Sequence, residues 1–167
     1  TGWLFSQFGK NPLNDLLTNA RKSHKVDVAS DAYVSPTPAV ALAEVMVQIA
    51  NLAEQGRIPR GRYHFAGTPT ASTYLFASEA LRQAHKFGLI DEYCCLVPKP
   101  INQAGSRATR PHNSALISQK LPELGIYPPR LAHRTFSQPG SDEGTTGPGR
   151  FRTLSGLRLI DNKAVAI

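Results

Sequence analysis

The first repeating pattern of apolar positions begins after Asn11-Pro12. Asparagine is a good helix cap, and proline at the first helical position removes only a backbone donor that has no partner there. Apolar residues then recur every three or four positions, which predicts an amphipathic helix from residue 12 to about 24, followed by a strand over 26–30. The apolar positions on the predicted face are Leu13, Leu16, Leu17 and Ala20.

A second helical pattern starts at Thr37-Pro38, with the same kind of start signal, and ends near Gly56. Its apolar positions form a broad face, so we expect this helix to be deeply buried. Thr37 is expected to cap the helix and, with Asp31 and Pro36, to shape the preceding turn. The apolar positions are Val40, Ala43, Met46, Val47, Ile49, Ala50 and Ala53.

The middle of the chain predicts a strand over 62–66 and a third helix. Ser72 is expected to cap this helix, which would run over 73–87 and end at Gly88. His64 lies within the predicted strand and is expected to be a hydrogen-bonded core residue. No other His, Cys, Asp or Glu lies near His64 at metal-ligand spacing, so no metal site is predicted.

The two cysteines are the adjacent pair Cys94 and Cys95. Neighbouring cysteines rarely form a disulfide, because the geometry distorts the peptide between them, and two thiols make no metal-ligand pattern. Both are therefore expected in the core, on a short strand over 93–97. A reducing cytoplasm is the expected compartment. Beyond a Pro- and Gly-rich loop over 98–109, Ser114 is expected to cap a short helix that reaches Lys120.

Alternating short strands and helices predict one small α/β domain over residues 1–136. The next stretch, residues 137–149, has almost no apolar residue and is rich in glycine and proline, which predicts a flexible linker open to proteolysis. The last residues, up to 167, are basic and mildly apolar without clear periodicity, and no function is assigned to them. Residues 137–167 are thus predicted to be a linker and a basic tail.

Composition narrows the class of protein. The 167 residues suit one domain, and with 41% apolar and 19% charged residues the chain resembles an ordinary soluble protein. No apolar run approaches the roughly 20 residues that span a bilayer. The net charge is +7, but the basic residues are scattered and no basic run is interleaved with aromatics. We therefore expect a solvated surface and a basic tail, with neither a nucleic-acid groove nor a membrane partner. An anionic sugar nucleotide is the other partner that the charge would suit.

Sequence motifs in a fixed order suggest a more specific interpretation. Residues 108–116 have the pattern A-x-R-P-x-N-S-x-L, and residues 61–67 have the pattern G-x-Y-H-x-A-G. Together the motifs resemble the carboxy-terminal, substrate-binding part of the dTDP-4-dehydrorhamnose reductases, which are extended short-chain dehydrogenases/reductases. The remaining motifs are a T-x-W segment at 1–6, a G-x-N turn at 9–11, a D-x-x-x-x-P-T-x-A stretch at 31–43 and an S-x-x-x-F-A helix start at 72–77.

The resemblance implies a fold, an activity and a set of binding residues. The fold is the small α/β substrate-binding domain of such an enzyme, without its Rossmann domain. The complete enzyme reduces the 4-keto group of dTDP-6-deoxy-L-lyxo-4-hexulose to give dTDP-L-rhamnose, with NADPH or NADH. Trp3 would stack on the deoxysugar, or else pack in the core at a domain seam. Arg110 and Asn113 would recognise the sugar nucleotide or the loop over it, or else Arg110 would hold loop carbonyls.

The catalytic signature of the family is not found in these residues. The family binds its cofactor at a Gly-rich turn and uses a Tyr-x-x-x-Lys pair, in which tyrosine protonates the carbonyl oxygen. Neither occurs here, so no catalytic, cofactor-binding or metal-binding residue is assigned. We expect the chain alone to bind no cofactor and to be inactive without the missing Rossmann domain.

Two other interpretations stay open. The chain could be part of a non-catalytic regulatory subunit resembling the β subunit of methionine adenosyltransferase, or a truncated product without function. An intact Gly-rich turn and Tyr-x-x-x-Lys pair in upstream sequence would favour the reductase. The oligomeric state is also open, and a homodimer of the complete protein is one option.

Overall fold

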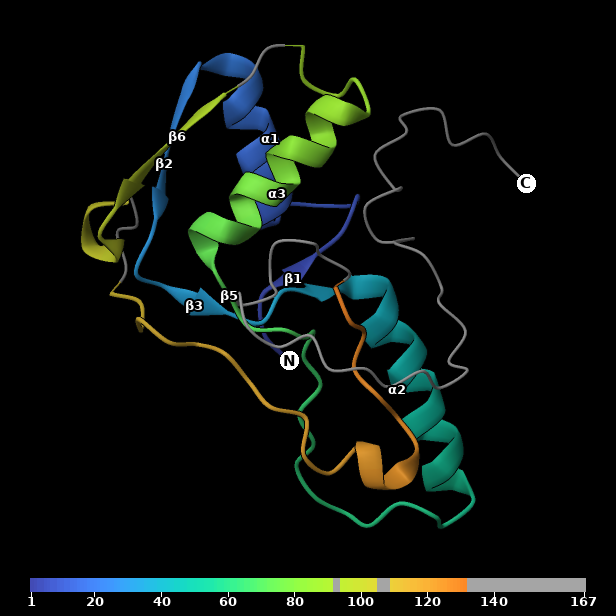
Figure 1. Cartoon of the computed structure of the whole chain (residues 1–167). Helices are drawn as coiled ribbons and strands as arrows, with labels where there is room; N and C mark the ends of the chain where they lie inside the picture. The colour runs from blue at the N-terminus through green and yellow to red at the C-terminus, as the bar shows by residue number, and fades with distance from the viewer. Residues whose placement is uncertain (92–93, 105–108, 132–167) are drawn as a thin grey trace, which may run out of the picture.

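The fold is taken from a computed structural model, which describes residues 1–91, 94–104 and 109–131. In this part of the chain, short strand pairs are combined with three α-helices (Figure 1). The predicted linker and tail, residues 137–167, lie outside the described residues. The elements in chain order are β1 (Leu4–Phe5), α1 (Pro12–Lys22), β2 (Lys25–Ala29), β3 (Tyr33–Val34), β4 (Thr37–Pro38), α2 (Ala39–Glu54), β5 (Ala71–Ser72), α3 (Thr73–Lys86), β6 (Cys95–Lys99) and the 3-10 helices η1 (Ile101–Gln103) and η2 (Pro122–Leu124).

Helix α1 forms as the sequence predicts. The side chain of Asn11 accepts hydrogen bonds from the backbone amides of Leu13 and Asn14, so it caps the helix, and Pro12 occupies the first turn. The predicted apolar face is the buried one. Helix α3 is also confirmed, with Ser72 as its cap, accepting from the amide of Leu75 at 3.1 Å.

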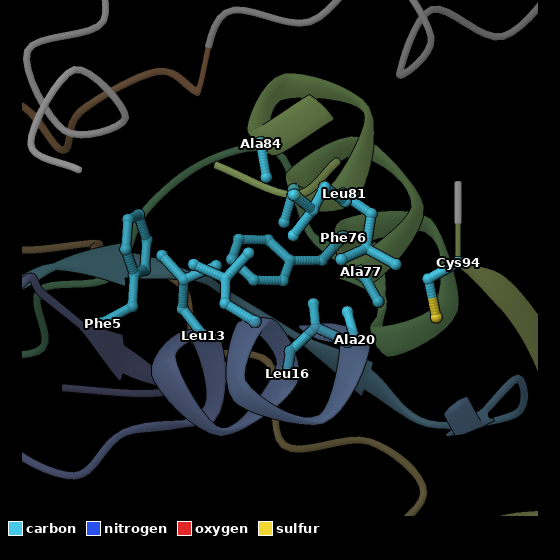
Figure 2. Packing of buried hydrophobic residues seen from close by; sticks show 12 residues of the cluster. Phe5, Leu13, Leu16, Ala20, Phe76, Ala77, Leu81, Ala84 and Cys94 are labelled. Carbon is cyan, nitrogen blue, oxygen red and sulfur yellow. The ribbon is translucent and has the colours of Figure 1, made fainter. Parts of the chain in front are cut away.

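Helices α1 and α3 enclose the first hydrophobic core together with the β2–β6 pair (Figure 2). Strands β2 and β6 are parallel, with Lys25 opposite Cys95 and Ala29 opposite Lys99. In Figure 2 the side chain of Phe76 extends from α3 toward the apolar face of α1. The most buried members of this core include Phe5, Leu13, Leu17, Ala77, Ala80, Leu81, Ala84 and Cys94.

The prediction for the cysteines is half wrong. Cys94 is buried, but Cys95 is exposed. Cys95 is the first residue of β6 and Cys94 directly precedes it. Successive residues of an extended chain point to opposite faces, so the two cannot both enter a core that covers one face of the β2–β6 pair. Burial, followed by the nearby thiol of Cys95, raises the pKa of the Cys94 thiol.

Helix α2 is confirmed as a helix, but the expectations about its start and its burial are wrong. The capping position is Pro38, with no side-chain cap, and the hydroxyl of Thr37 is used elsewhere. Of its residues only Val45 is fully buried, while Met46 and Val47 are each 61% exposed. One face of α2 packs on the second core, made of Val45 with Phe65, Leu121 and Ile126. Among the described residues, nothing covers its other apolar face.

Two local predictions in the second half of the described chain are also wrong. Residues 62–66 form no strand, and the amide of Ala66 donates to the side chain of Ser118 at 3.2 Å. His64 is exposed and not a core residue. Ser114 caps no helix: its hydroxyl donates to the carbonyl of Tyr33 at 3.3 Å, and the described helical turn begins only at Pro122.

Glu79 is the one buried acid among the described residues, and its carboxylate is held by neighbours on α3. Arg82 donates to its two oxygens at 2.6 and 2.5 Å, and Gln83 donates at 2.7 Å. The hydrogen bond to Glu79 raises the pKa of Arg82, and this effect exceeds the lowering of the pKa by burial. These contacts therefore join neighbouring turns of α3.

None of the helices in the described part of the chain combines the length and apolar character of a bilayer-spanning segment.

Candidate functional site

The candidate site begins with the N-terminal segment, where Trp3 has a left-handed backbone with φ of 39°. Such a conformation is uncommon for a bulky residue and is maintained only where surrounding contacts impose it. Here the carbonyl of Trp3 accepts from the amide of Thr37 at 3.1 Å. The indole packs edge-on against Phe76, with ring centroids 5.0 Å apart, and it remains partly exposed at the margin of the first core. Trp3 is thus anchored by packing while part of its surface faces solvent.

The second part of the site is the segment that contains Arg110 and Asn113. It runs beside β3, since the amide of Tyr33 donates to the carbonyl of His112 at 2.7 Å and the amide of Ser114 donates to the carbonyl of Tyr33 at 2.9 Å. The side chain of Asn113 accepts from the amide of Ala115 at 3.0 Å, which closes a local turn. Asn113 and Arg110 are both exposed. The four residues before Thr109, including Arg107, lie outside the described part of the chain.

The N-terminal segment and this second segment are neighbours. A Cβ placed on Gly2 would lie 3.5 Å from Cδ1 of Leu116 and 3.7 Å from the carbonyl oxygen of Ser114, which is ordinary van der Waals contact. The chain therefore brings the residues around Trp3 and the residues around Asn113 to one region, although they are far apart in sequence. The segment that contains Asn113 is held to β3, where Asn113 forms an isolated parallel bridge with Tyr33.

A buried polar cluster joins these segments; we call Ser35, Pro36, Thr37 and Gly67 the Thr37 junction. Thr37 is 0% exposed and Ser35 is 1% exposed. The hydroxyl of Thr37 donates to the carbonyl of Ser35 at 3.0 Å and accepts from the amide of Gly67 at 3.0 Å. The hydroxyl of Ser35 bonds to both the amide and the carbonyl of Leu116, at 3.2 and 3.3 Å. Every hydroxyl in the junction is thus satisfied, as buried polar groups require.

Sequence reasoning missed the Thr37 junction because it interpreted Thr37 as a helix cap. The sequence signal was the glycine at position 67, which ends the G-x-Y-H-x-A-G motif. In the structure, a Cβ at this position would lie 2.0 Å from the carbonyl oxygen of Pro36. Only glycine permits two backbones to approach this closely. Ser35, in contrast, gave no signal, because a serine in a loop is unremarkable until its partner is known.

Asp31, which precedes β3, connects this region to η1. Its carboxylate accepts from the amide of Ile101 at 2.8 Å at the start of η1, and its second oxygen lies 3.3 Å from Nδ1 of His112. The His112 ring is 69% exposed, so this contact is an ion pair only when the ring is protonated. The expectation that Asp31 shapes a turn therefore fits its contacts.

The starts of the described helices are the positions at which the glycine-rich turn that the sequence motifs lacked would lie. The side chain of Asn11 caps α1 and that of Ser72 caps α3, whereas α2 follows Pro36-Thr37-Pro38 and has no side-chain cap. Among the described helices, none follows a glycine-rich turn that could hold a pyrophosphate. The 167 residues also contain no Tyr-x-x-x-Lys. In the described ranges, no group of three or more His, Cys, Asp or Glu side chains is placed to hold a metal ion.

Comparisons with known proteins agree on one family. The family model described as "RmlD substrate binding domain" matches residues 1–136. The dTDP-4-dehydrorhamnose reductase of Aggregatibacter actinomycetemcomitans is 29% identical over 130 residues, which are 77% of this chain and 44% of that protein. The enzyme of the same name from Escherichia coli K12 is 27% identical over 145 residues, 82% of this chain and 48% of that protein. The chain thus spans less than half the length of these relatives.

A solved structure supports the fold. The crystal structure of dTDP-4-dehydrorhamnose reductase from Bacillus anthracis, in complex with NADP, superposes with a TM-score of 0.63 at 20% identity. The match covers 77% of this chain and 42% of that one. The expected small α/β fold of the reductase type is thereby confirmed.

Proposed function

This chain belongs to the RmlD substrate binding domain family, and from that membership we propose that it forms the sugar-nucleotide-binding part of a dTDP-4-dehydrorhamnose reductase-like protein. The resemblance drawn from the motifs is confirmed by the family match over residues 1–136 and by the curated relatives. The proposed ligand is dTDP-6-deoxy-L-lyxo-4-hexulose, which a complete enzyme of this kind would reduce to dTDP-L-rhamnose. A nicotinamide cofactor, NADPH or NADH, would supply the hydride from a domain outside the described residues.

The observation that carries the proposal is the meeting of the Trp3 segment and the 109–116 segment at the Thr37 junction. An aromatic ring and a guanidinium on neighbouring segments suit the two parts of a sugar nucleotide. The partly exposed indole of Trp3 would contact the apolar face of the deoxysugar, and Arg110 would bind the diphosphate. Asn113 would hold the loop between them through its bond to Ala115.

A saturation-transfer NMR experiment on the 167-residue chain tests the proposal. The probe is dTDP-L-rhamnose, and GDP-mannose at the same concentration is the control, because it shares the diphosphate but not the thymine or the 6-deoxy group. We expect transfer to the thymine protons and to the sugar methyl group, and much less to GDP-mannose. Equal transfer to both ligands, or none to either, would contradict the proposal.

A further inference from the structure

Residues 109–114, the segment that carries Arg110, have no buried side chain. A segment without apolar anchors keeps one conformation only where hydrogen bonds or ion pairs attach it to the rest of the domain. Two backbone hydrogen bonds join the carbonyl of His112 and the amide of Ser114 to Tyr33 on β3. Both bonds lie after Arg110 in the chain, so the position of Arg110 depends on how firmly His112 is held.

The carboxylate of Asp31 contacts the chain on both sides of Arg110. One oxygen accepts from the amide of Ile101, before Arg110, at 2.8 Å. The other lies 3.3 Å from Nδ1 of His112, after Arg110. The backbone carbonyl of Asp31 lies 3.3 Å from the same ring nitrogen, so the imidazole can donate to two oxygens of one residue. Asp31 is thus a common attachment point for both flanks of Arg110.

The backbone at Asp31 is itself fixed by its two neighbours. The amide of Ser30 donates to the carbonyl of Lys99 in β6 at 2.9 Å. Ala32 is 4% exposed, and its carbonyl accepts from the amide of Thr73, the first residue of α3, at 2.8 Å. The side chain of Asp31, in contrast, is 40% exposed, and ion pairs at such positions contribute little to stability. Its contacts therefore suit the placement of a segment better than the support of the fold.

Pro111 makes the attachment of His112 effective at Arg110. A proline ring fixes its own φ and restricts the preceding residue to extended conformations. Arg110-Pro111-His112 is consequently a stiff unit, in which the position of His112 limits the directions that the Arg110 side chain can take. A guanidinium that is placed in advance loses less entropy when it binds a diphosphate.

We propose that Asp31 is a positioning residue for the sugar-nucleotide site, which acts through His112 to hold Arg110 where it meets the diphosphate. The ligand in this proposal rests on the proposed function, whereas the attachment of residues 109–114 to Asp31 does not. Asp31 contacts no ligand in this account, because a carboxylate repels a diphosphate. Its two oxygens are directed to the amide of Ile101 and the ring of His112 instead.

Amide exchange in the ligand-free 167-residue chain tests the attachment. In Asp31→Ala the amides of Tyr33 and Ser114, which bond across the two segments, should exchange faster by about three- to tenfold. The matched control is Asp27→Ala, which removes another partly exposed aspartate with an ion-pair partner, Lys99 at 2.5 Å, and should leave both rates unchanged. Equal rates in Asp31→Ala and the wild type would overturn the proposal.

His112→Ala separates placement from support of the fold, because it keeps the bond between Asp31 and Ile101. This variant should melt close to the wild type and accelerate exchange at Ser114 as Asp31→Ala does. If Asp31→Ala unfolded the chain while His112→Ala changed nothing, Asp31 would have a purely structural role and the proposal would be wrong.

The affinity for dTDP-L-rhamnose tests the action through Arg110. Asp31→Ala should lower the affinity of the wild-type chain by about three- to fivefold, but that of Arg110→Ala by less than about twofold, because residues that act through one contact are not additive. Equal losses in the two backgrounds would overturn the proposal. A wild-type chain that does not bind the sugar nucleotide would contradict the proposed function, whereas the exchange rates would still decide whether Asp31 holds residues 109–114.

Discussion

The backbone amide of Gly67 donates a hydrogen bond of 3.0 Å to Oγ1 of Thr37, a residue 30 positions earlier in the chain. The two backbones are so close that a Cβ on Gly67 would lie 2.0 Å from the carbonyl oxygen of Pro36. The backbone amide of Thr37 in turn donates a hydrogen bond of 3.1 Å to the carbonyl of Trp3. The geometry of the candidate site thus depends on a contact that has no space for a side chain.

The first prediction follows from that contact. Gly67→Ala should destabilise the chain by about 1 to 3 kcal/mol or more, because the added methyl meets backbone atoms and the segments must separate. Urea unfolding followed by circular dichroism measures this loss. Gly2→Ala is the matched control, since its Cβ would find ordinary contacts, and it should change stability by less than about 0.5 kcal/mol. Similar stabilities for the two variants would show that the junction is not tightly packed.

The hydroxyl of Thr37 leads to a second prediction. Thr37→Val keeps the shape but leaves the buried amide of Gly67 without its acceptor, which costs about 1 to 3 kcal/mol. Thr37→Ser keeps the hydroxyl and loses one buried methyl group, so its loss should be smaller, near 1 kcal/mol. Unfolding free energies of the two variants rank the effects. If Thr37→Val were the more stable of the two, the hydrogen bond would not be what holds the junction.

The sequence was sufficient to predict the three α-helices of the described chain and the buried face of α1, but not the burial of α2. Asn11 and Ser72 could be identified as caps because a cap depends on a few adjacent residues. The burial of α2 could not be predicted, because the apolar pattern shows that a face needs a partner and does not show whether the described residues supply it.

The candidate site could be predicted only in part, because motifs identify its segments but not the contacts between them. The motifs identified the segments around Trp3 and Arg110. The contact between these segments depends on Ser35, which bonds to Leu116, and on Gly67, which bonds to Thr37, and both partners are far away in sequence. The strand predicted over residues 62–66 is not formed. The amide of Ala66 donates instead to the hydroxyl of Ser118, and a side-chain acceptor of this kind leaves no periodic signal in the sequence.

The two cysteines should differ in reactivity. Cys95 is exposed, whereas Cys94 is buried. Burial raises the pKa of the Cys94 thiol, so a smaller fraction of Cys94 side chains is in the reactive thiolate form at a given pH. Iodoacetamide at pH 8 should therefore modify Cys95 first in the folded chain. Peptide mass spectrometry over time measures both rates, and denaturation should make them similar. Faster modification of Cys94 under native conditions would contradict its burial in the first core.

The chain alone should not oxidise NADPH in the presence of dTDP-6-deoxy-L-lyxo-4-hexulose. Its sequence has no Tyr-x-x-x-Lys, and the described helices offer no glycine-rich cofactor turn. The loss of absorbance at 340 nm is the readout, with a complete reductase as the positive control. Turnover by the purified 167-residue chain would mean that it carries catalytic groups that this structure does not identify.

Variants at Trp3 and Arg110 separate ligand binding from structural support. Trp3→Ala should weaken sugar-nucleotide binding by about 1 to 3 kcal/mol through the loss of stacking. It should also lower the melting temperature, since the indole packs on Phe76. Trp3→Phe is the control that keeps an aromatic ring in that contact. Arg110→Ala should weaken binding with little change in melting temperature, because the contacts of an exposed side chain contribute little to stability.

The central claim, that this chain provides a sugar-nucleotide site near Trp3 and Arg110, is tested most directly by one titration. The dissociation constant of dTDP-L-rhamnose is measured by NMR for the 167-residue chain and for Arg110→Ala, with melting temperatures recorded on the same samples. We predict an affinity for the variant that is lower by about tenfold, which corresponds to about 1.4 kcal/mol, at an unchanged melting temperature. Equal affinity of the two proteins, or no saturable binding by the wild type, would contradict the account.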